Sequence, residues 1–171
     1  NTIYSGDTRF DRVVQVAKAK KHFPVVEAFV KGSKILVAGS TWPEDEYFLA
    51  NLINNSLPGG QNHEIFGTLK FIIAPHEVEA HHLEKLEDAL KATAIRFSEA
   101  HEDTVKDKRV LIIDSIGLLS HIYQYADFVY IGGGFGKGIH NILEAATWGK
   151  PVLFGPAYEK FREAVELSES A

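Results

Sequence analysis

The sequence predicts an α/β domain built on a doubly wound, Rossmann-like parallel sheet flanked by helices. Short apolar runs rich in β-branched residues alternate along the chain with longer segments of helical periodicity. Such runs are typical of strands buried on both faces of a parallel sheet, and the alternation indicates βαβ crossovers. The chain has 171 residues, which is enough for one domain with a sizeable core. We therefore expect residues 1–171 to form a single domain.

Each expected strand is a short apolar run, and each expected helix is an amphipathic segment between two such runs. The strands are expected at residues 34–38 (KILVA), 70–74 (KFIIA), 110–114 (VLIID), 128–132 (FVYIG) and 151–154 (PVLF), with a weaker one at 93–97. The helices are expected at residues 7–22, 44–55, 79–91, 116–125, 141–148 and 158–167. Residues 57–67 and 100–108 are expected to form loops, and the chain has no internal repeat.

Composition excludes several classes of function. The net charge is −5 and the longest basic run is Lys20-Lys21, which disfavours nucleic acid as a partner. With no cysteine, the chain has no disulfide framework, thiolate nucleophile or cysteine zinc site. No apolar run is long enough to span a membrane, and the N-terminus lacks a signal-peptide pattern. The sequence starts at Asn1 and stops within an amphipathic pattern, so we expect a piece of a longer protein.

The residues just after each strand are the candidates for ligand binding. In an open parallel sheet, ligands bind at the carboxyl ends of the strands, near the point where the strand order reverses. In this chain those positions are small, polar or glycine-containing turns. They are Gly39-Ser40-Thr41, Pro75-His76-Glu77, Asp114-Ser115, Gly132 to Gly138, and Gly155-Pro156.

The most distinctive stretch is residues 132–151, GGGFGKGIHNILEAATWGKP. It fails the Walker A pattern because Gly138 follows Lys137, and it fails GxGxxG because the third glycine is missing from either start. NAD binding and ATP hydrolysis are therefore disfavoured. Glycines still let backbone N–H groups approach an anion, and Lys137 and a helix N-terminus add positive charge. The alternative is that the glycines only form a tight strand-to-helix turn.

Asn141 and Glu144 also allow two interpretations. Asn141 can be the N-cap of the next helix, with Glu144 at the third helical position in a capping box. Glu144 can instead face the crevice and accept hydrogen bonds from both hydroxyls of a ribose. The spacing alone does not separate these interpretations.

Two other groups of residues are assigned structural roles. The run His76-Glu77-x-Glu79-x-His81-His82 could suggest a metal site, but it does not match HExxH and a polar helix start is the commoner explanation. We therefore expect no metal. Trp42 and Trp148 are expected to be packing residues rather than platforms for a sugar.

Residues 132–156 resemble the donor-site signature of the 3-deoxy-D-manno-octulosonic acid (Kdo) transferases, which is roughly GG…GGHN-x-LE…G-x-PV-x-x-GP. Further blocks agree in order and spacing: residues 6–13 (GDTRFDRV), 35–46 (ILVAGSTWPEDE), 71–77 (FIIAPHE) and 110–134. The chain departs from the pattern at His76-Glu77, where Arg-His is common, and at Leu118, where many members have Glu. It departs again at Ile139 in the GGHN element and at Lys160, where many members have Asn.

The resemblance implies the C-terminal, donor-binding half of a GT-B glycosyltransferase, with the N-terminal acceptor domain absent. The implied reaction moves Kdo from the donor substrate CMP-Kdo to a lipid A precursor in lipopolysaccharide biosynthesis, without a cofactor. The general base is expected in the missing domain, so the isolated fragment is expected to be soluble and inactive. The full-length protein is expected at the cytoplasmic face of the bacterial inner membrane.

The resemblance also implies roles for individual residues. Lys137 stabilises the leaving group, Glu144 holds the ribose, and the turn Asp114, Ser115 and Gly117 lines the cytosine pocket. The other implied donor-binding residues are Ser40, Thr41, His76, Gly134, Gly136, Gly138, His140 and Asn141. Two alternatives remain open: a UDP-sugar glycosyltransferase or epimerase domain, and a nucleotide-binding module without catalytic activity.

Overall fold

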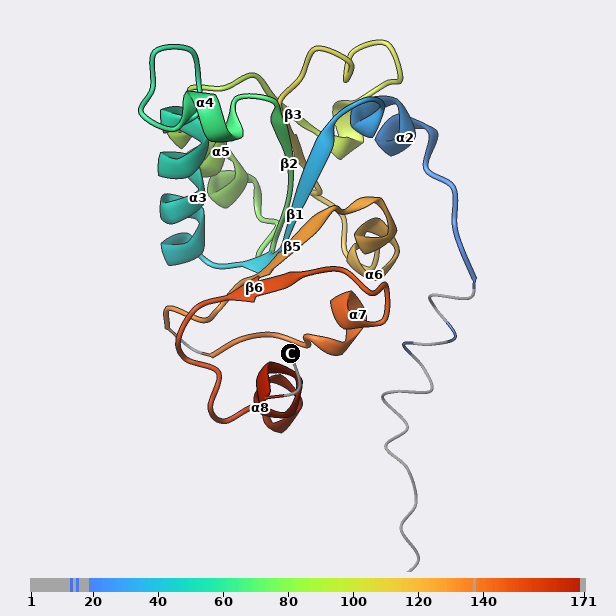
Figure 1. The fold of residues 1–171 in the computed structure, drawn as a ribbon. Coiled ribbons are helices and arrows are strands. Elements are labelled where there is room, and N and C mark those ends of the chain that lie inside the picture. The colour runs from blue at the N-terminus through green and yellow to red at the C-terminus, as the bar shows by residue number, and fades with distance from the viewer. Residues whose placement is uncertain (1–12, 14, 16–18, 137, 170–171) are drawn as a thin grey trace, which may run out of the picture.

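A six-stranded parallel sheet forms the centre of the protein (Figure 1). The computed structural model describes residues 13, 15, 19–136 and 138–169. The strand order is β3-β4-β2-β1-β5-β6, and every pairing is parallel. The strands are β1 (Lys34–Thr41), β2 (Leu69–Pro75), β3 (Ala94–Arg96), β4 (Val110–Ile112), β5 (Phe128–Ile131) and β6 (Val152–Phe154). The doubly wound α/β fold predicted from the sequence is therefore confirmed.

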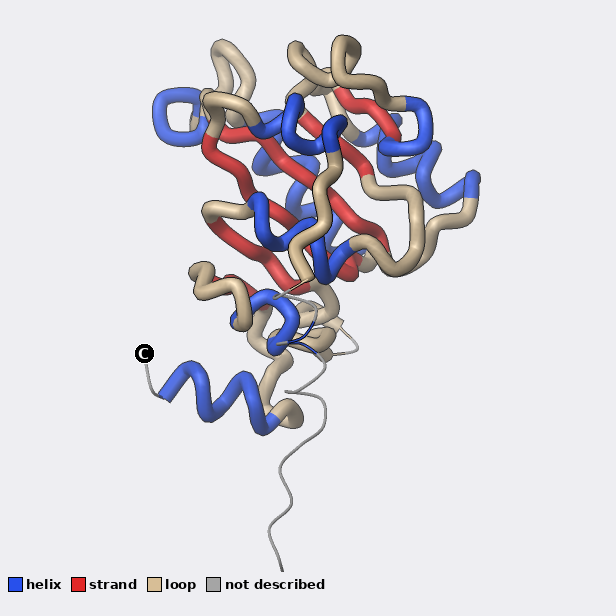
Figure 2. Tube along the Cα trace, turned by 90° about the vertical axis from the view of Figure 1, so that its right-hand side faces the viewer, coloured by secondary structure: helices blue, strands red, loops and turns tan. Residues whose placement is uncertain are grey.

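Helices cover both faces of the sheet, as Figures 1 and 2 show. On one face, α3 and α5 pack over side chains such as Leu36 and Ala38 of β1. On the other face, α2, the α6–η2 segment and α7 pack over Ile35 and Val37. Alternate residues of β1 thus enter two separate cores, which explains its unbroken apolar sequence. The helices are α2 (Pro24–Val30), α3 (Pro43–Asn55), α4 (His63–Phe66), α5 (Ala80–Ala89), α6 (Leu119–Ile122), α7 (Leu143–Ala146) and α8 (Arg162–Glu169), with 3₁₀ turns η1 (Phe97–Glu99) and η2 (Tyr123–Tyr125).

Several helices differ from the sequence prediction, including the one expected at 158–167, which is α8 and begins at Arg162. Most of the helix expected at 7–22 lies outside the described residues, and α2 begins after it at Pro24, a residue that favours the first helical turn. The short α4 lies within the expected loop 57–67. The helix expected at 116–125 begins later because Gly117 has a left-handed φ of 85°. The helix expected at 141–148 is only the four-residue α7. Among the described residues, no helix is long and apolar enough to cross a membrane.

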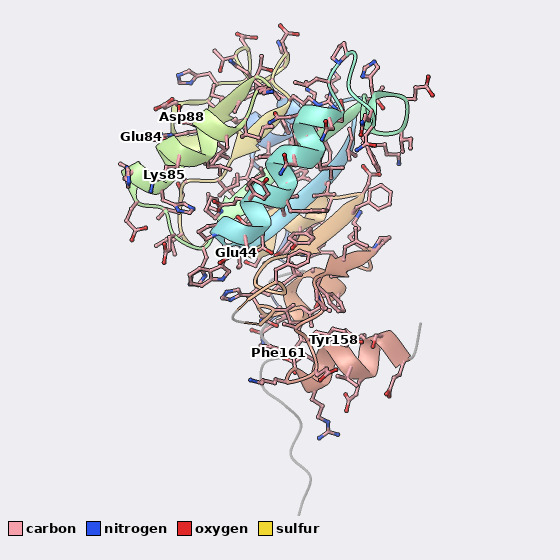
Figure 3. The ribbon with its side chains drawn as sticks, turned by 90° about the vertical axis from the view of Figure 1, so that its left-hand side faces the viewer. Glu44, Glu84, Lys85, Asp88, Tyr158 and Phe161 are labelled. Atoms are coloured by element: carbon pink, nitrogen blue, oxygen red, sulfur yellow. The ribbon has the colours of Figure 1, made fainter. Side chains whose placement is uncertain are left out.

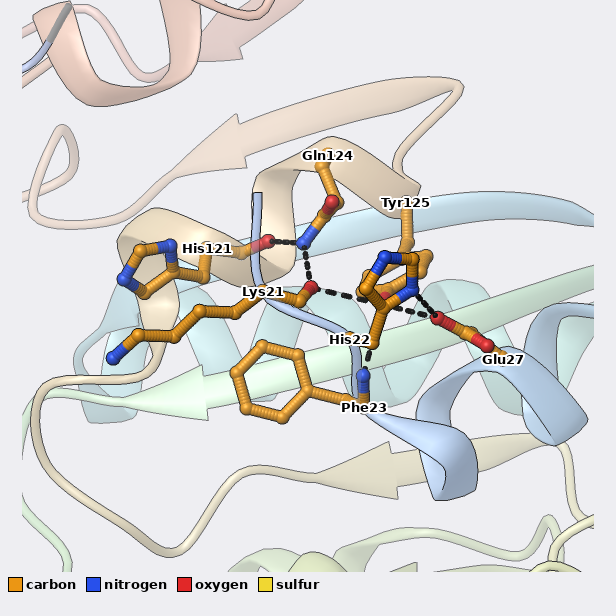
Figure 4. Close-up of polar contacts among 7 residues, drawn as sticks. All are labelled: Lys21, His22, Phe23, Glu27, His121, Gln124 and Tyr125. Atoms are coloured by element: carbon orange, nitrogen blue, oxygen red, sulfur yellow. Dashed lines mark hydrogen bonds and ion pairs between the residues drawn. The ribbon is translucent and has the colours of Figure 1, made fainter. Parts of the chain in front are cut away.

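The segment that leads into α2 is fixed to η2 by polar contacts (Figure 4). The hydroxyl of Tyr125 accepts a hydrogen bond from the Phe23 backbone N–H at 3.2 Å and donates to Glu27 Oε1 at 3.1 Å. The side-chain amide of Gln124 donates to the Lys21 carbonyl at 2.8 Å. The chain therefore enters the domain on the face that carries α6 and α7.

Replacing Tyr125 with Phe should remove the hydroxyl's contacts with Phe23, Glu27 and the Lys21 carbonyl while keeping the ring. We expect a loss of about 1–2 kcal/mol in the free energy of unfolding, since a half-buried backbone N–H loses its partner. Urea unfolding followed by circular dichroism measures this loss. Tyr47→Phe, at a residue that is 74% exposed, is the matched control and should change stability by less than about 0.5 kcal/mol. Equal stability of the two variants would contradict the assigned role of Tyr125.

Candidate functional site at the switch point of the sheet

The strand order reverses at β1, which has β2 on one side and β5 on the other. The carboxyl ends of β1 and β5 therefore flank the crevice in which doubly wound folds bind ligands. The Gly132 N–H donates to the Gly39 carbonyl at 2.9 Å and joins the two turns. Ser40 has a φ of 52°, the only positive φ of a non-glycine residue within the described part of the chain. The backbone is thus strained beside the crevice, as often occurs at functional sites.

Most glycines of the loop 132–138 are required by the packing of the protein itself. A methyl group on Gly132 would lie 2.3 Å from the Ser40 carbonyl oxygen, and one on Gly134 would lie 2.5 Å from the Gly155 nitrogen. Gly133 combines a φ of 91° with a contact to the Gly138 carbonyl. Gly136 differs, because a methyl group there would meet nothing within 4 Å. A tight turn therefore explains the neighbouring glycines and leaves Gly136 unexplained.

Hydrogen bonds within the loop restrict where an anion could bind. The N–H groups of Gly136 and Gly138 both donate to the Gly133 carbonyl, at 3.1 and 2.9 Å. Among the described residues, no group accepts a hydrogen bond from the N–H of Gly134 or Phe135. The predicted backbone anion site is therefore reduced to these two amides. Lys137 lies outside the described residues.

The carboxylate of Asp45 holds the loop against the start of α3. It accepts hydrogen bonds from the backbone N–H of Gly133 at 2.8 Å, that of Trp42 at 2.9 Å and the hydroxyl of Tyr130 at 2.5 Å. Asp45 is only 1% exposed, and burial together with this carboxylate raises the pKa of Tyr130. Asp45 was not predicted as a site residue. The capping pattern Trp42-Pro43-x-Asp45 was a usable signal for one of its contacts.

Thr41 is held by a second buried carboxylate. Its hydroxyl donates to Glu46 Oε1 at 3.0 Å, and Glu46 Oε2 lies 2.9 Å from His82 Nε2. Burial raises the pKa of Glu46, while the contacts with His82 and Thr41 act in the opposite direction. The Thr41 hydroxyl, a predicted donor to the ligand, is therefore engaged inside the protein. Ser40 beside it is half-buried.

Three aromatic side chains from different parts of the chain gather above β1. The ring of Trp42 stacks on His76 at 4.3 Å between centroids, and His76 lies 4.5 Å from His140. Trp42 Nε1 donates to His140 Nε2 at 3.0 Å. Because an indole N–H only donates, this nitrogen of His140 accepts and carries no proton. Burial lowers the pKa of His140, and the neighbouring His76 lowers it further. Trp42 thus lines the site, whereas Trp148 donates to the Ser120 carbonyl and packs on the core.

Asn141 and Glu144 lie on the opposite side of the switch point. The Leu143 N–H donates to Asn141 Oδ1 at 3.1 Å, but the N-cap of α7 is Ile142, so the predicted capping box of Asn141 and Glu144 is wrong. Glu144 is half-buried and lies close enough to the Tyr123 hydroxyl to raise its pKa, in addition to the larger effect of burial. That hydroxyl fills the space beside Gly39. Glu144 therefore lies on the face of the sheet that carries Tyr123. Because α7 has only four residues, the predicted helix dipole is weak.

The predicted cytosine-pocket residues lie farther along the sheet edge. Asp114, Ser115 and Gly117 follow β4, which β2 separates from β1, about 10 Å away at the usual strand spacing. The Asp114 carboxylate accepts hydrogen bonds from the backbone N–H and the hydroxyl of Ser98. After this turn, the side chains of Leu119 and Tyr123 lie against Gly39 of β1. This turn therefore shares the face of the sheet that carries Glu144.

A cleft of about 260 Å³ lies between the start of α3 and the glycine-rich loop. Its lining includes Trp42, Glu44, Asp45, Glu77, Phe135 and Gly136. Figure 3 shows Glu44 at the end of α3 nearest the loop. Within the described residues, no three His, Asp or Glu side chains are grouped so that they could hold a metal ion. Glu44 was not predicted as a site residue, whereas Phe135 lies within the predicted binding turn Gly132 to Gly138.

Comparisons with known proteins agree with this geometry. No family model matches the chain. It is 31% identical over 132 residues to the 3-deoxy-D-manno-octulosonic acid transferase of Rickettsia prowazekii, covering 74% of this chain and 26% of the relative. It is 31% identical over 106 residues to the transferase of the same name from Aquifex aeolicus, covering 61% of this chain and 28% of the relative. The chain thus spans about a quarter of the length of these curated relatives.

A solved structure has the same fold. The C-terminal CMP-Kdo binding domain of WaaA from Acinetobacter baumannii superposes with a TM-score of 0.67 at 21% identity, covering 96% of this chain and 81% of the other. Fold and switch-point loop therefore define a Rossmann-like α/β domain of the kind that forms the C-terminal half of GT-B glycosyltransferases. Within that class, the chain is a relative of the 3-deoxy-D-manno-octulosonic acid transferases.

Replacing Asp45 with Ala should leave the buried N–H of Gly133, the buried Tyr130 hydroxyl and the partly buried N–H of Trp42 without their partner. We expect a loss of about 3 kcal/mol in the free energy of unfolding, because each buried orphan group costs roughly 1–3 kcal/mol. Asp45→Asn keeps an acceptor oxygen and should lose about 1 kcal/mol. Urea unfolding measures both variants against Glu44→Ala, an exposed neighbour. Similar stabilities of Asp45→Ala and Glu44→Ala would show that Asp45 does not hold the loop.

The lowered pKa of His140 predicts a pH-dependent stability. The folded protein holds this ring neutral, while the unfolded chain takes up a proton near pH 6.5. The unfolded state therefore binds more protons just below this pH, so stability falls as the pH drops through about 6.5. Chemical unfolding at pH 8 and pH 5.5 should show a smaller loss for His140→Gln than for the unchanged protein. An equal loss in both would contradict the neutral, hydrogen-bonded state of His140.

Proposed function

We propose that this chain is the donor-binding domain of a glycosyltransferase that moves Kdo from CMP-Kdo to a lipid A precursor. The observation that carries the proposal is the glycine-rich loop at the switch point of the sheet, in a chain related to the Kdo transferases. The neighbour of similar fold is itself described as a CMP-Kdo binding domain. The donor is the only small molecule in the proposal, which includes no metal and no cofactor.

In the proposed reaction the loop receives the phosphate of CMP as it leaves. The phosphate gains negative charge when the bond to the sugar breaks, and donors already aimed at it lower the barrier. The N–H groups of Gly134 and Phe135 are the described donors of the loop that have no partner within the described residues. Lys137 is proposed to add a full positive charge beside them. Gly136 has open space where a side chain would stand, so a ligand can approach its backbone closely.

The nucleoside is proposed to lie on the face of the sheet that carries α7. Glu144, which lies on α7 near Tyr123, would accept hydrogen bonds from the ribose hydroxyls. The turn at Ser115 and Gly117 on the same face would line the cytosine pocket. His76, His140 and Ser40 would complete the donor site from the turns of the neighbouring strands.

The acceptor and its surroundings belong to the rest of the proposed enzyme. The chain spans about a quarter of its curated relatives, and we place the general base and the acceptor site in a preceding domain. A lipid A precursor lies in a membrane, so the full-length protein is proposed to work at the cytoplasmic face of the bacterial inner membrane. The chain alone is proposed to bind the donor without transferring it.

Titration with CMP tests this proposal. We expect CMP to shift the amide resonances of residues 134–141, and Glu144→Ala to weaken CMP binding by about tenfold, the effect of losing hydrogen bonds to a charged group. UDP should bind more weakly than CMP. Glu102→Ala, in the exposed loop 100–108, is the control and should leave the affinity unchanged. Absence of CMP-dependent shifts at residues 134–141 would refute the donor-site assignment.

A further inference from the structure

The carboxyl end of β1 carries a bulge at Ser40. The pairing of β1 with β2 shifts its register between Gly39 and Thr41, so Ser40 is an extra residue without a partner on β2. It is also the residue with the φ of 52°. A left-handed conformation is strained for serine, and it persists only where the surrounding structure holds it. The residues around the bulge therefore determine how Ser40 is oriented at the crevice.

Hydrogen bonds fix both neighbours of the bulge. The Gly39 carbonyl accepts a hydrogen bond from the glycine-rich loop at 2.9 Å, and the Thr41 carbonyl accepts one from the His76 N–H at 2.9 Å. The Thr41 side chain is buried, and its hydroxyl donates to Glu46 Oε1 at 3.0 Å. Thr41 thus has a backbone contact and a side-chain contact immediately after the bulge.

Glu46 is held by His82. A buried carboxylate is costly unless it is paired, and Glu46 is only 6% exposed. His82 Nε2 lies 3.0 Å from Glu46 Oε1 and 2.9 Å from Oε2. Glu46 belongs to α3 and His82 to α5, and these helices lie side by side over one face of the sheet (Figures 1 and 3). Three side chains therefore connect α5 through α3 to the end of β1.

We propose that Glu46 and His82 are positioning residues for Ser40. Through Thr41 they hold the bulge in the conformation that orients Ser40 for a ligand, and they do so without contacting the ligand themselves. Among the described residues, no group forms a hydrogen bond with the Ser40 hydroxyl, which leaves it for a ligand. The part of this inference that concerns ligand binding rests on the donor-binding function proposed above.

The amide of Ser40 tests the positioning role without any ligand. The scalar coupling between its N–H and Hα protons reports its φ. We expect His82→Ala and Thr41→Val to change this coupling and to shift the amide resonance, because each variant breaks the connection between α5 and the bulge. His81→Ala is the matched control, since it removes the same side chain from the adjacent, exposed position of α5 and should change neither. An unchanged coupling in both test variants would overturn the inference.

The affinity for CMP tests the consequence for a ligand. We expect Ser40→Ala and His82→Ala each to weaken CMP binding by about tenfold, the effect of losing a hydrogen bond to a charged group. The double variant should lose little more than either single variant, because both changes remove the same contact. Glu46→Ala should weaken binding as His82→Ala does. Glu46→Gln keeps an oxygen that accepts from Thr41 and should retain most of the affinity.

Glu87→Ala separates positioning from general stability. It breaks the ion pair between α5 and Arg96, so it loosens the same helix without touching Glu46, and it should leave the CMP affinity unchanged. If it weakens binding as much as His82→Ala, or if the effects of Ser40→Ala and His82→Ala add in the double variant, the pair only stabilises the fold and the inference is wrong. If the unchanged protein does not bind CMP, the proposed function fails, and the coupling of Ser40 still decides whether the pair holds the bulge.

Discussion

The carboxylate of Asp45 is the interaction on which the geometry of the candidate site depends. A loop so rich in glycine loses much conformational entropy when it adopts one conformation. Close packing alone does not fix the direction of its amides. Asp45 accepts a hydrogen bond from the N–H of Gly133 in the loop and another from the N–H of Trp42 at the start of α3. One side chain therefore sets the loop, the helix start and the indole ring relative to one another. Burial makes this stronger, since Asp45 is 1% exposed and its contacts with Gly133 and Tyr130 are buried.

The switch point is chemically different on its two sides. On the α3 side, the cleft joins exposed carboxylates to aromatic rings. On the α7 side, Glu144 lies near Tyr123 and the end of β1, and the turn at Ser115 follows on the same face. The loop amides lie between the two sides.

The strands and the turns after them could be predicted from the sequence, because they depend on the pattern of neighbouring residues. The strands were predictable because β1, β2 and β5 are buried on both faces and so are apolar without interruption. The turns at Ser40, His76 and the glycine-rich loop were predictable because parallel strands bring their carboxyl ends to one edge. The helix boundaries near Gly117 and α7 were not, since a left-handed residue and tertiary packing determine them. Asp45 and Gly133 are separated by 88 positions, so no local pattern could reveal their hydrogen bond.

The resemblance to the Kdo transferases predicts Arg-His where this chain has His76-Glu77, and in the proposed reaction this difference changes how charge is supplied. Trp42 donates to His140 and stacks on His76, and burial lowers the pKa of His140. Near neutral pH this cluster therefore offers aromatic surface and, at His140, no positive charge. In the proposed reaction, stabilisation of the leaving phosphate then depends on the loop amides and on Lys137. Amides stabilise charge only when they are aimed in advance, so the shape of the loop takes over part of the role of a side-chain cation. In the proposed reaction, the buried carboxylate of Asp45 meets this requirement by holding the loop in one conformation.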